Sequence, residues 1–275
     1  MTTALIDGDI ITYRCAASVS MDEPVELVIN RIDNLMTQTL DATEASSFEF
    51  YIKGEENFRH KIYPEYKTNR ILEKPFHLQE AVSYVKECWN AIPSGIYESD
   101  DMLGIRQREN TVICTIDKDL NMIPGLHYNF VKCTEDRISY MDGIRYFWKQ
   151  MLIGDTSDNI FGIRGIGPKN AAKLIDWMDN EQDMFDLVYE KYNDPKRFVL
   201  NANCLWILQE EEGMWANQQR LILPSQCQHE VEAALEFMKS LNLITSTVLG
   251  MKNNEMSGIP VNGVGAEPIQ TNLVD

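Results

Sequence analysis

The chain has 275 residues, of which 44% are hydrophobic and 24% charged, and this composition excludes a fibrous or wholly disordered protein. Its 25 basic and 42 acidic residues give a formal net charge of −17, which argues against a generally basic nucleic-acid-binding surface. No apolar run reaches the ~18–20 residues of a membrane helix, and the first ten residues contain two aspartates and no basic residue. We therefore expect a soluble, intracellular, cytoplasmic protein with no membrane partner.

Apolar patterns predict strands and helices in alternation along the first half of the chain. The predicted strands are residues 4–7, 48–53, 111–116 and 126–132, and the predicted helices are 10–16, 25–40 and 77–92, the last ending before Pro93. Such alternation favours an α/β fold, in which a mostly parallel sheet is flanked by helices on both sides.

The second half has a different pattern. Helical spacing recurs from about residue 138 to 242 and no convincing strand is expected there. The last stretch lacks aromatic residues and contains GIPVNGVGAEP, which is typical of a flexible segment. We predict an α/β region over 1–137, a helical region over 138–243 and a flexible tail over 244–275.

A basic and aromatic segment, KGEENFRHKIYPEYKTNRILEKP (53–75), fits neither pattern. Six basic residues are interleaved there with Phe58, Tyr63 and Tyr66 in an otherwise acidic chain. Such a mixture favours a site for the phosphates and bases of nucleic acid. The alternative is a solvated loop with a few ion pairs.

Carboxylates gather at points where strands end or helices begin. They are Asp7 at the end of the first strand, Glu98, Asp100 and Asp101 in ESDDMLG, Asp117 and Asp119 in CTIDKDL, and Asp155 and Asp158 in LIGDTSDNI. Because ligands bind beyond the carboxyl ends of parallel strands, several of these groups should meet at one sheet edge. Asp155 and Asp158 are three apart and would share one face if their segment is helical.

Gathered carboxylates repel one another strongly unless cations neutralise them. Hard divalent cations such as Mg²⁺ or Mn²⁺ prefer all-oxygen sites, and two ions about 4 Å apart can act together on a phosphodiester. Setting aside these eight carboxylates and nearby Asp9 lowers the formal charge from −17 to −8. For any single group, a helix cap or a turn remains the simpler alternative.

The segment GIRGIGPKNAAKLI (162–175) predicts a second kind of phosphate contact. It contains Arg164, Lys169 and Lys173 and no acidic residue. Its glycines, Gly165 and Gly167 among them, permit backbone amides to approach a phosphate, and Pro168 is suited to the first turn of a helix. A helix, a glycine turn and a second helix would hold a nucleic-acid backbone without reading its sequence. The alternative is a glycine turn between packed helices.

Over residues 4–210, the chain resembles the 5′ nuclease family of flap endonucleases and bacteriophage 5′→3′ exonucleases. The resemblance lies in LIDGD, PEYKTNR, ESDDMLG, CTIDKDL followed by MIPG, and GDTSDNI followed by GIRGIGPKNAAKLI. It implies a PIN-like fold with a helix-three-turn-helix element, two Mg²⁺ or Mn²⁺ ions per site, and hydrolysis at or near DNA 5′ ends. Implied substrates are duplexes with a 5′ end, nick, gap or flap, including RNA-primed DNA, as in phage-type replication or repair.

The resemblance also assigns roles to residues. It implies that Lys67 and Arg70 belong to a basic helical arch facing the scissile phosphate, where Tyr66 would stack on a base. Gly165, Gly167 and Lys169 match the element that holds duplex backbone, commonly with a K⁺ ion. The metal site would comprise Asp7, Glu98, Asp100, Asp101, Asp117, Asp119, Asp155 and Asp158. Nothing in the apolar pattern demands a partner subunit, which favours a monomer.

One position departs from the family. Many relatives carry an aspartate just before the glycine that follows the second strand, where this chain has Lys53. A positive charge there leaves the number of metal ions and the balance of exonuclease to endonuclease action open.

Three alternatives remain. LIDGDII resembles the strand end of haloacid-dehalogenase-like phosphatases, with Asp7 as nucleophile and Asp9 as acid or base. Lys53 would suit a noncatalytic DNA-binding relative, and an RNA-degrading relative with a similar sheet would prefer single-stranded RNA.

Overall fold

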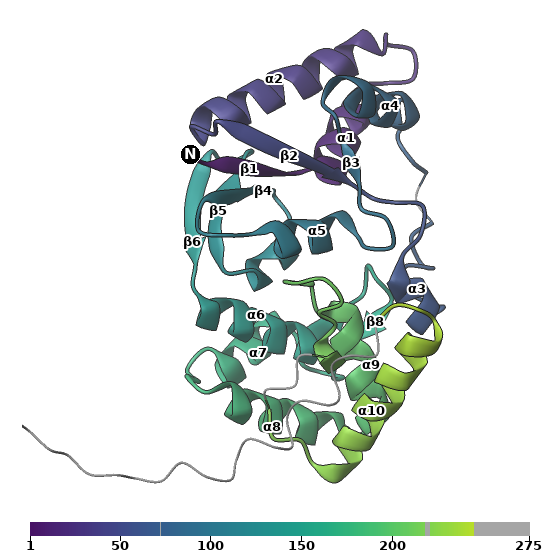
Figure 1. Cartoon of the computed structure of the whole chain (residues 1–275), viewed down its shortest axis with the longest axis vertical. Helices are drawn as coiled ribbons and strands as arrows, with labels where there is room; N and C mark the ends of the chain where they lie inside the picture. Colours follow the sequence, from purple (N-terminus) through teal and green to yellow (C-terminus); the bar gives the residue numbers. More distant parts are fainter. Residues whose placement is uncertain (72, 218–220, 245–275) are drawn as a thin grey trace, which may run out of the picture. The chain divides into compact units, whose positions relative to one another are not determined.

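Six strands form one sheet in the order β3-β2-β1-β4-β5-β6 in the computed structural model, which describes residues 1–71, 73–217 and 221–244 (Figure 1). The strands are β1 (Thr3–Asp7), β2 (Ser47–Ile52), β3 (Ile92–Pro93), β4 (Thr111–Cys114), β5 (Gly125–Asn129) and β6 (Thr134–Ile138). Neighbouring strands run parallel except β5 and β6, which are antiparallel. The mostly parallel α/β fold is therefore confirmed.

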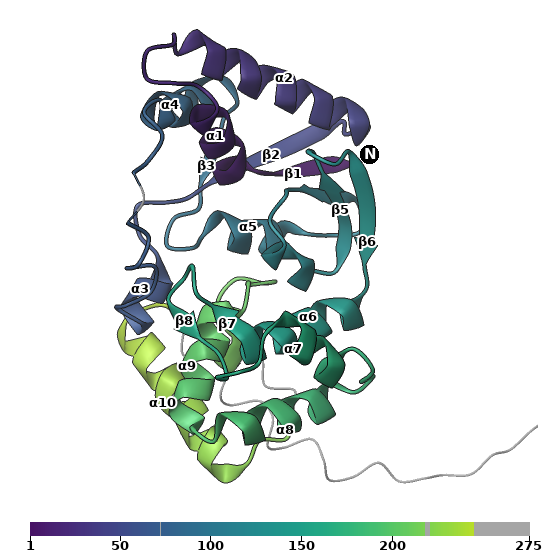
Figure 2. The same ribbon diagram turned by 180° about the vertical axis from the view of Figure 1, so that it is seen from behind.

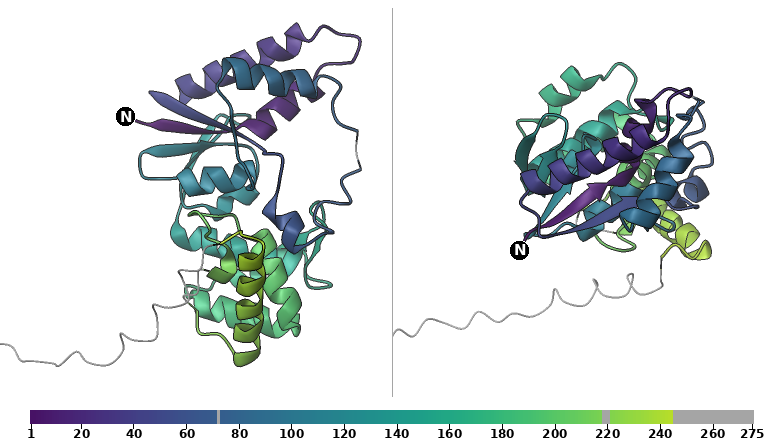
Figure 3. Two further views of the ribbon diagram at one scale, coloured as in Figure 1. Left: turned by 45° about the vertical axis from the view of Figure 1, so that its right-hand side comes forward. Right: turned by 90° about the horizontal axis from the view of Figure 1, so that it is seen from above.

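Helices cover both faces of the sheet because its central strands are apolar on both sides. The helices of this part are α1 (Gly8–Ala17), α2 (Glu26–Ala42), α3 (Phe58–Ile62), α4 (Leu78–Cys88) and α5 (Ser99–Arg106), and a 3₁₀ turn η1 (Asp119–Met122) follows β4. Ile6 and Cys114 pack with residues of α1, α2 and α4, whereas Leu5 and Ile113 pack with α5. Figure 3 shows α1, α2 and α4 together over one face.

The described part of the second half is mainly helical, as predicted. It contains α6 (Tyr140–Ile153), β7 (Gly154–Asp155), β8 (Ile160–Phe161), α7 (Pro168–Ile175), α8 (Glu181–Tyr192), α9 (Pro195–Leu205), the 3₁₀ turn η2 (Trp215–Asn217) and α10 (Ser225–Ser240) (Figure 2). These helices surround the fully buried Trp148, whose ring contacts Phe147, Phe185 and Phe198. The same hydrophobic core continues to Leu5 in the sheet, so Met1–Ile244 form one compact unit.

The sheet region departs from the predicted elements most clearly at the two edge strands, β3 and β6. The helix expected over 77–92 begins at Leu78 and ends at Cys88, because Asn90 adopts a left-handed backbone (φ 50°) that terminates it. The chain then adds Ile92–Pro93 to the sheet as the edge strand β3. Strand β6 (Thr134–Ile138) was not predicted, because its sequence TEDRI lacks an apolar face and is held by its ladder with β5.

The region after residue 138 also contains two short strands that were not predicted. Gly154–Asp155 pairs with Ile160–Phe161 in an antiparallel hairpin of two residues a side. The predicted tail, 244–275, lies outside the described residues from 245 onward. None of the described helices is long and apolar enough to span a membrane.

Candidate metal and nucleic-acid site

Asp7 links the first strand to the first helix. It ends β1, and its Oδ1 accepts a hydrogen bond from the Ile10 backbone N–H (3.3 Å), which caps α1. Its Oδ2 accepts a bond from the Thr115 hydroxyl (2.6 Å), which lies just beyond β4. Because β1 and β4 are parallel neighbours, this bond ties together the carboxyl ends of both strands.

Asp117 and Asp119 follow β4 in a turn that hydrogen bonds hold in place. The Asp117 backbone N–H donates to the Thr115 hydroxyl (2.9 Å), and Asp117 Oδ1 accepts from the Asp119 backbone N–H (2.9 Å). Two side chains of α6, Tyr146 (2.9 Å) and Gln150 (2.6 Å), donate to Asp119 Oδ1. Helix α6 therefore positions this carboxylate against the sheet edge.

The ESDD segment forms the N-terminus of α5, as predicted. Glu98 is the N-cap residue and forms a reciprocal capping box with Asp101. The Ser99 hydroxyl donates to Asp9 Oδ2 (2.8 Å), which ties the start of α5 to the start of α1. Asp100 accepts no hydrogen bond from any residue in the described ranges, so both of its oxygens are available to a cation.

Asp101 differs from the other predicted ligands because a buried arginine and two backbone N–H groups together donate four hydrogen bonds to it. Arg59 binds it bidentately (2.6 and 2.8 Å), and the backbone N–H groups of Glu98 (3.0 Å) and Leu208 (3.1 Å) complete its shell. Arg59 is 2% exposed and Asp101 0% exposed. This buried pair joins α3 to α5, and the structure leaves Asp101 no oxygen directed at a cation.

Asp155 and Asp158 do share a surface, but not because their segment is helical. Asp155 belongs to β7, and residues 156–159 form the turn into β8. Asp155 Oδ1 accepts bonds from the backbone N–H (2.8 Å) and hydroxyl (2.7 Å) of Ser157. The tight turn, stabilised by its own aspartate, brings the two carboxylates together.

The basic segment 53–75 contacts these carboxylates directly. Lys67 Nζ forms an ion pair with Glu98 and lies 3.6 Å from Asp158 Oδ2, and the Arg70 guanidinium pairs with Asp158 Oδ1. The Lys67 backbone N–H also donates to the Asp158 carbonyl (3.0 Å), with Lys67 in a left-handed conformation (φ 58°). Both predicted arch cations therefore lie at the carboxylate cluster.

Tyr66 does not present its ring to a ligand in this structure. It is 1% exposed, and its hydroxyl donates to Glu98 Oε2 and Asp158 Oδ2, both at 2.8 Å. The tyrosine predicted to stack on a base instead holds two carboxylates of separate segments in place.

Burial and neighbouring charges shift the pKa values of several of these carboxyl groups. Burial, and then the nearby charges of Asp9 and Asp117, raises the pKa of Asp7 to about 7. Burial and the charges of Asp7 and Asp117 also raise the pKa of Asp100 well above its usual value. In contrast, Arg59 and Lys67 outweigh the effect of burial on Glu98 and lower its pKa to about 2.

Asp119 lies within electrostatic range of both Asp117 and the carboxylates of the β7 turn. Burial raises its pKa to about 6, with further contributions from the charges of Asp117, Asp155 and Asp158. No three His, Cys, Asp or Glu side chains within 1–71, 73–217 and 221–244 already have an arrangement that would hold a metal ion. The donor set nevertheless fits hard divalent cations, because it consists of carboxylates whose mutual repulsion a cation would relieve.

The glycine turn has the exposed cations expected of a phosphate contact. Gly165 adopts a left-handed backbone (φ 84°), and the space above Gly165 and Gly167 is open. Arg164, Lys169 and Lys173 are exposed and form no ion pair with any residue in the described ranges. Strand β8, not a helix, directly precedes the turn, while α7 follows it and packs against α6.

Comparison with known proteins identifies the family. A family model described as "5'-3' exonuclease, N-terminal resolvase-like domain" matches residues 2–144, slightly more than half of the chain. The chain belongs to the 5′-3′ exonuclease family. The predicted resemblance is thereby confirmed, and the phosphatase alternative is excluded at the level of family.

Relatives in this family include both large polymerases and small nucleases. The chain is 29% identical over 219 residues to DNA polymerase I of Caldicellulosiruptor bescii, covering 67% of this chain and 25% of the polymerase. It is 26% identical over 191 residues to the flap endonuclease Xni of a Shewanella species, covering 62% of this chain and 73% of that enzyme. The chain thus spans about a quarter of the length of the polymerases it matches.

Solved structures of the bacteriophage T5 enzyme have the same fold. A T5 flap endonuclease in complex with DNA and metal ions matches with a TM-score of 0.61 and 16% identity, covering 87% of this chain and all of that one. T5 5′-exonuclease with divalent zinc ions matches with a TM-score of 0.61 and 19% identity, covering 86% of this chain and 99% of that one.

Lys53, the departure from the family pattern, lies beside Asp9. The Lys53 backbone N–H donates to both oxygens of Asp9 (3.1 Å each), and the Lys53 charge partly offsets the burial that raises the Asp9 pKa. Asp9 therefore fixes the exit of β2 relative to α1 and, through Ser99, to α5.

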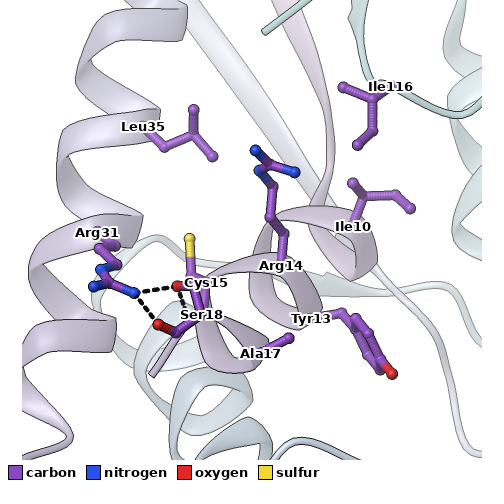
Figure 4. A pocket seen from close by; sticks show the side chains of 9 residues that line it. All are labelled: Ile10, Tyr13, Arg14, Cys15, Ala17, Ser18, Arg31, Leu35 and Ile116. Atoms are coloured by element: carbon purple, nitrogen blue, oxygen red, sulfur yellow. Dashed lines mark hydrogen bonds between the residues drawn. The ribbon is translucent and has the colours of Figure 1, made fainter. Parts of the chain in front are cut away.

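Several residues that organise the carboxylate site carry no distinct signal in the amino-acid sequence. Arg59, Tyr146 and Gln150 bind the carboxylates from other segments, and only the basic character of 53–75 hinted at Arg59. A hollow of about 700 Å³ also lies between α1 and α2, where Arg31 bonds to Ser18 (Figure 4). No predicted site residue lines this hollow.

Proposed function

We propose that this chain is a metal-dependent 5′→3′ exonuclease and flap endonuclease that hydrolyses phosphodiester bonds at or near DNA 5′ ends. One observation carries the proposal: carboxylates from β1, α5, the β4 exit and the β7 turn lie within electrostatic range of one another. The cations of Lys67 and Arg70 stand beside them. Membership of the 5′-3′ exonuclease family supports the same activity.

Two basic residues would bind the scissile phosphate, and two hydroxyl-bearing residues would position the carboxylates. Lys67 and Arg70 are 20% and 54% exposed, so a phosphate can compete with Glu98 and Asp158 for them. On the scissile phosphate, they would offset the negative charge that develops during hydrolysis. Tyr66 and Thr115 would hold the surrounding carboxylates in position by hydrogen bonds, without contacting the substrate.

Two Mg²⁺ or Mn²⁺ ions fit this site as cofactors. Asp100, Asp117, Asp119 and Asp155 would hold them through oxygens that accept no hydrogen bond from the described residues, and Asp7 would bind through an oxygen that also accepts one hydrogen bond. Glu98 and Asp158 would join them once Lys67 and Arg70 turn to the substrate. Bound divalent ions supply Lewis-acid stabilisation of charge on the phosphodiester. The T5 relatives solved with metal ions support divalent cations in general.

Duplex DNA would be held at the glycine turn. Open backbone at Gly165 and Gly167 and the cations Arg164, Lys169 and Lys173 suit one strand's phosphates without base readout. The main-chain carbonyls of this turn are the proposed site for K⁺. The similarity to DNA polymerase I and to a flap endonuclease supports a role in replication or repair, including removal of RNA primers.

The test is cleavage of a duplex and a 5′-flap DNA, labelled separately at the 5′ and 3′ ends, in Mg²⁺, Mn²⁺ or EDTA. We expect metal-dependent release that starts from the 5′ label and is abolished in Asp155→Asn/Asp158→Asn, while duplex binding is largely retained. Asp22→Asn/Asp183→Asn is the matched control, because both aspartates are exposed and remote in sequence from the cluster.

Contrary outcomes have distinct meanings. Near-normal cleavage by Asp155→Asn/Asp158→Asn would refute the assigned metal site. Binding of DNA without cleavage in either metal would favour the hypothesis, based on Lys53, of a noncatalytic DNA-binding relative. A preference for cleaving single-stranded RNA would favour an RNA-degrading enzyme.

A further inference from the structure

A polar groove of about 750 Å³ lies beyond the carboxyl ends of β4 and β5, on the side of α6. Residues 115–118 after β4 form one wall, and Asn129 at the end of β5 with Val131 and Lys132 just after it form the next. Strand β6 and helix α6 close the remaining sides. Its volume falls within the range of sites that bind small ligands, about 300–1,000 Å³.

The groove is continuous with the carboxylate cluster. Asp117 and Thr115 line it, and Thr115 donates its hydroxyl hydrogen bond to Asp7. Tyr146 also lines the groove and donates to Asp119 (2.9 Å). A ligand in the groove would therefore lie directly beside the position that the scissile phosphate occupies in the proposed function.

Charges in the groove favour an anion despite the net charge of −17. Lys118, Lys132 and Arg137 are exposed and form no ion pair with the residues that the structure describes. The other two cations are already paired, Arg145 with Asp142 (3.2 Å) and Lys149 with Asp176 (2.7 Å).

Apart from Asp117, one carboxylate of the groove lacks an ion pair within the described ranges. This is Asp136, which stands opposite His127 in the β5–β6 ladder. Three unpaired cations thus face two unpaired anions, Asp117 and Asp136. Val131 is 46% exposed and adds an apolar surface at the same rim, which suits a sugar or base more than a free inorganic anion.

We propose that this groove is a nucleotide-binding subsite, in which Lys118, Lys132 and Arg137 bind phosphate groups adjacent to the scissile bond. The proposal rests on the proposed nuclease function and extends it from the reacting phosphate to its neighbours. The ligand is either an unpaired stretch of the substrate strand or the nucleotide released from it. Both present the same chemistry, a phosphate next to a sugar and a base.

Two natural cysteines allow a footprint at the edge of the groove. Cys133 is exposed and follows Lys132 in the β5–β6 turn, whereas Cys88 is exposed at the end of α4. The full chain in EDTA would be alkylated with and without a single-stranded oligodeoxynucleotide or deoxyadenosine 5′-monophosphate, and each cysteine followed by mass spectrometry. We expect saturating ligand to slow alkylation of Cys133 and to leave Cys88 unchanged.

A charge-reversal pair tests the cations themselves. Lys132→Glu/Arg137→Glu should weaken oligonucleotide binding and lower the slope of log affinity against log salt by about 1.4, because each lost single-strand phosphate contact contributes about 0.7. The control Lys86→Glu/Lys191→Glu makes the same charge change at exposed residues of α4 and α8 and should leave the slope unchanged.

The two ligands distinguish the source of the phosphate. Protection of Cys133 by the oligonucleotide supports a strand subsite, and protection by the monophosphate supports a site for released nucleotide. Unchanged alkylation with both ligands, or equal loss of affinity in both double variants, would overturn the proposal. These assays detect binding without metal, so they are independent of the cleavage test. Protection of Cys133 in a protein that cleaves no DNA would refute the proposed nuclease function and leave the subsite standing. Cleavage of DNA by a protein whose Cys133 is not protected would refute the subsite and leave the nuclease function standing.

Discussion

Replacing Arg59 with methionine should destabilise the fold far more than replacing a comparable surface arginine. The Arg59 guanidinium donates to Asp101 twice and to the backbone carbonyls of Cys204 (2.9 Å) and Trp206 (2.7 Å). A single side chain therefore joins the basic segment, α5 and the end of α9. Methionine keeps much of the side-chain volume but removes all of these donors.

The expected loss of unfolding free energy comes from the buried Asp101 carboxylate, which the substitution leaves without its cation. Asp101 would remain at 0% exposure with a full negative charge and only two backbone N–H donors, from Glu98 and Leu208. Breaking a buried ion pair by removing one partner costs about 3–5 kcal/mol, because the remaining charge is uncompensated. At a slope of about 2–3 kcal/mol per M urea, the unfolding midpoint should fall by about 1–2.5 M.

The assay is equilibrium urea unfolding followed by tryptophan fluorescence, with Arg106→Met as the matched control. Arg106 also binds its partner bidentately, through Glu49 at 2.9 and 2.7 Å, but is 50% exposed. Exposed pairs contribute about 0–1 kcal/mol, so this control should shift the midpoint little. The double variant Arg59→Met/Asp101→Leu removes both charges and should regain part of the lost stability.

A midpoint for Arg59→Met that matches Arg106→Met would refute this reasoning. A double variant that is less stable than Arg59→Met alone would refute it as well. That result would mean that the lost stability comes from altered side-chain packing and not from an uncompensated charge. If Arg59→Met fails to fold, the double variant and the control still separate the two explanations.

Three further predictions concern single side chains. Tyr66→Phe removes a buried hydroxyl that donates to two carboxylates, and should lower the free energy of unfolding by about 1–3 kcal/mol in the same urea assay; an unchanged midpoint would contradict the positioning role. Lys169→Ala should weaken binding to all duplex sequences alike and lower the salt slope by about 1, unlike Lys191→Ala, whereas sequence-selective loss would argue against a backbone contact. Burial raises the pKa of Cys15 to about 11, so it should be alkylated at pH 8 more slowly than exposed Cys88 and should speed up as pH rises toward 10; equal rates at pH 8 would contradict it.

The parallel sheet was predictable because its central strands are short apolar runs separated by amphipathic helices. Residues 4–7 and 111–116 correspond to β1 and to a slightly shorter β4. The edge strands were harder: β6 is polar and β3 has two residues, so each depends on backbone pairing with a neighbour that the sequence does not reveal. Local apolar periodicity cannot detect a strand that buries no side chain face.

The location of the site was also predictable, because parallel strands must present their carboxyl ends at one edge. Asp7 and Asp117 lie there for that reason alone. The path of 154–161 was not predictable, since a turn stabilised by Asp155 and Ser157, and not a helix, brings Asp155 and Asp158 together. Short polar residues bond to the nearby backbone in turns, so a three-residue spacing of aspartates is compatible with a turn as well as with a helical face.

Asp100 and Asp101 show where the sequence stops being informative. They are adjacent in the same helical turn, so their side chains point about 100° apart around α5. One is directed toward the other carboxylates, and the other meets an arginine 42 positions away in sequence. Both residues match an acidic pattern equally well, yet one carboxylate is left free for a cation while the other holds the basic segment to the sheet. Which aspartate does which depends on where α3 packs, and that is a property of the tertiary structure rather than of the motif.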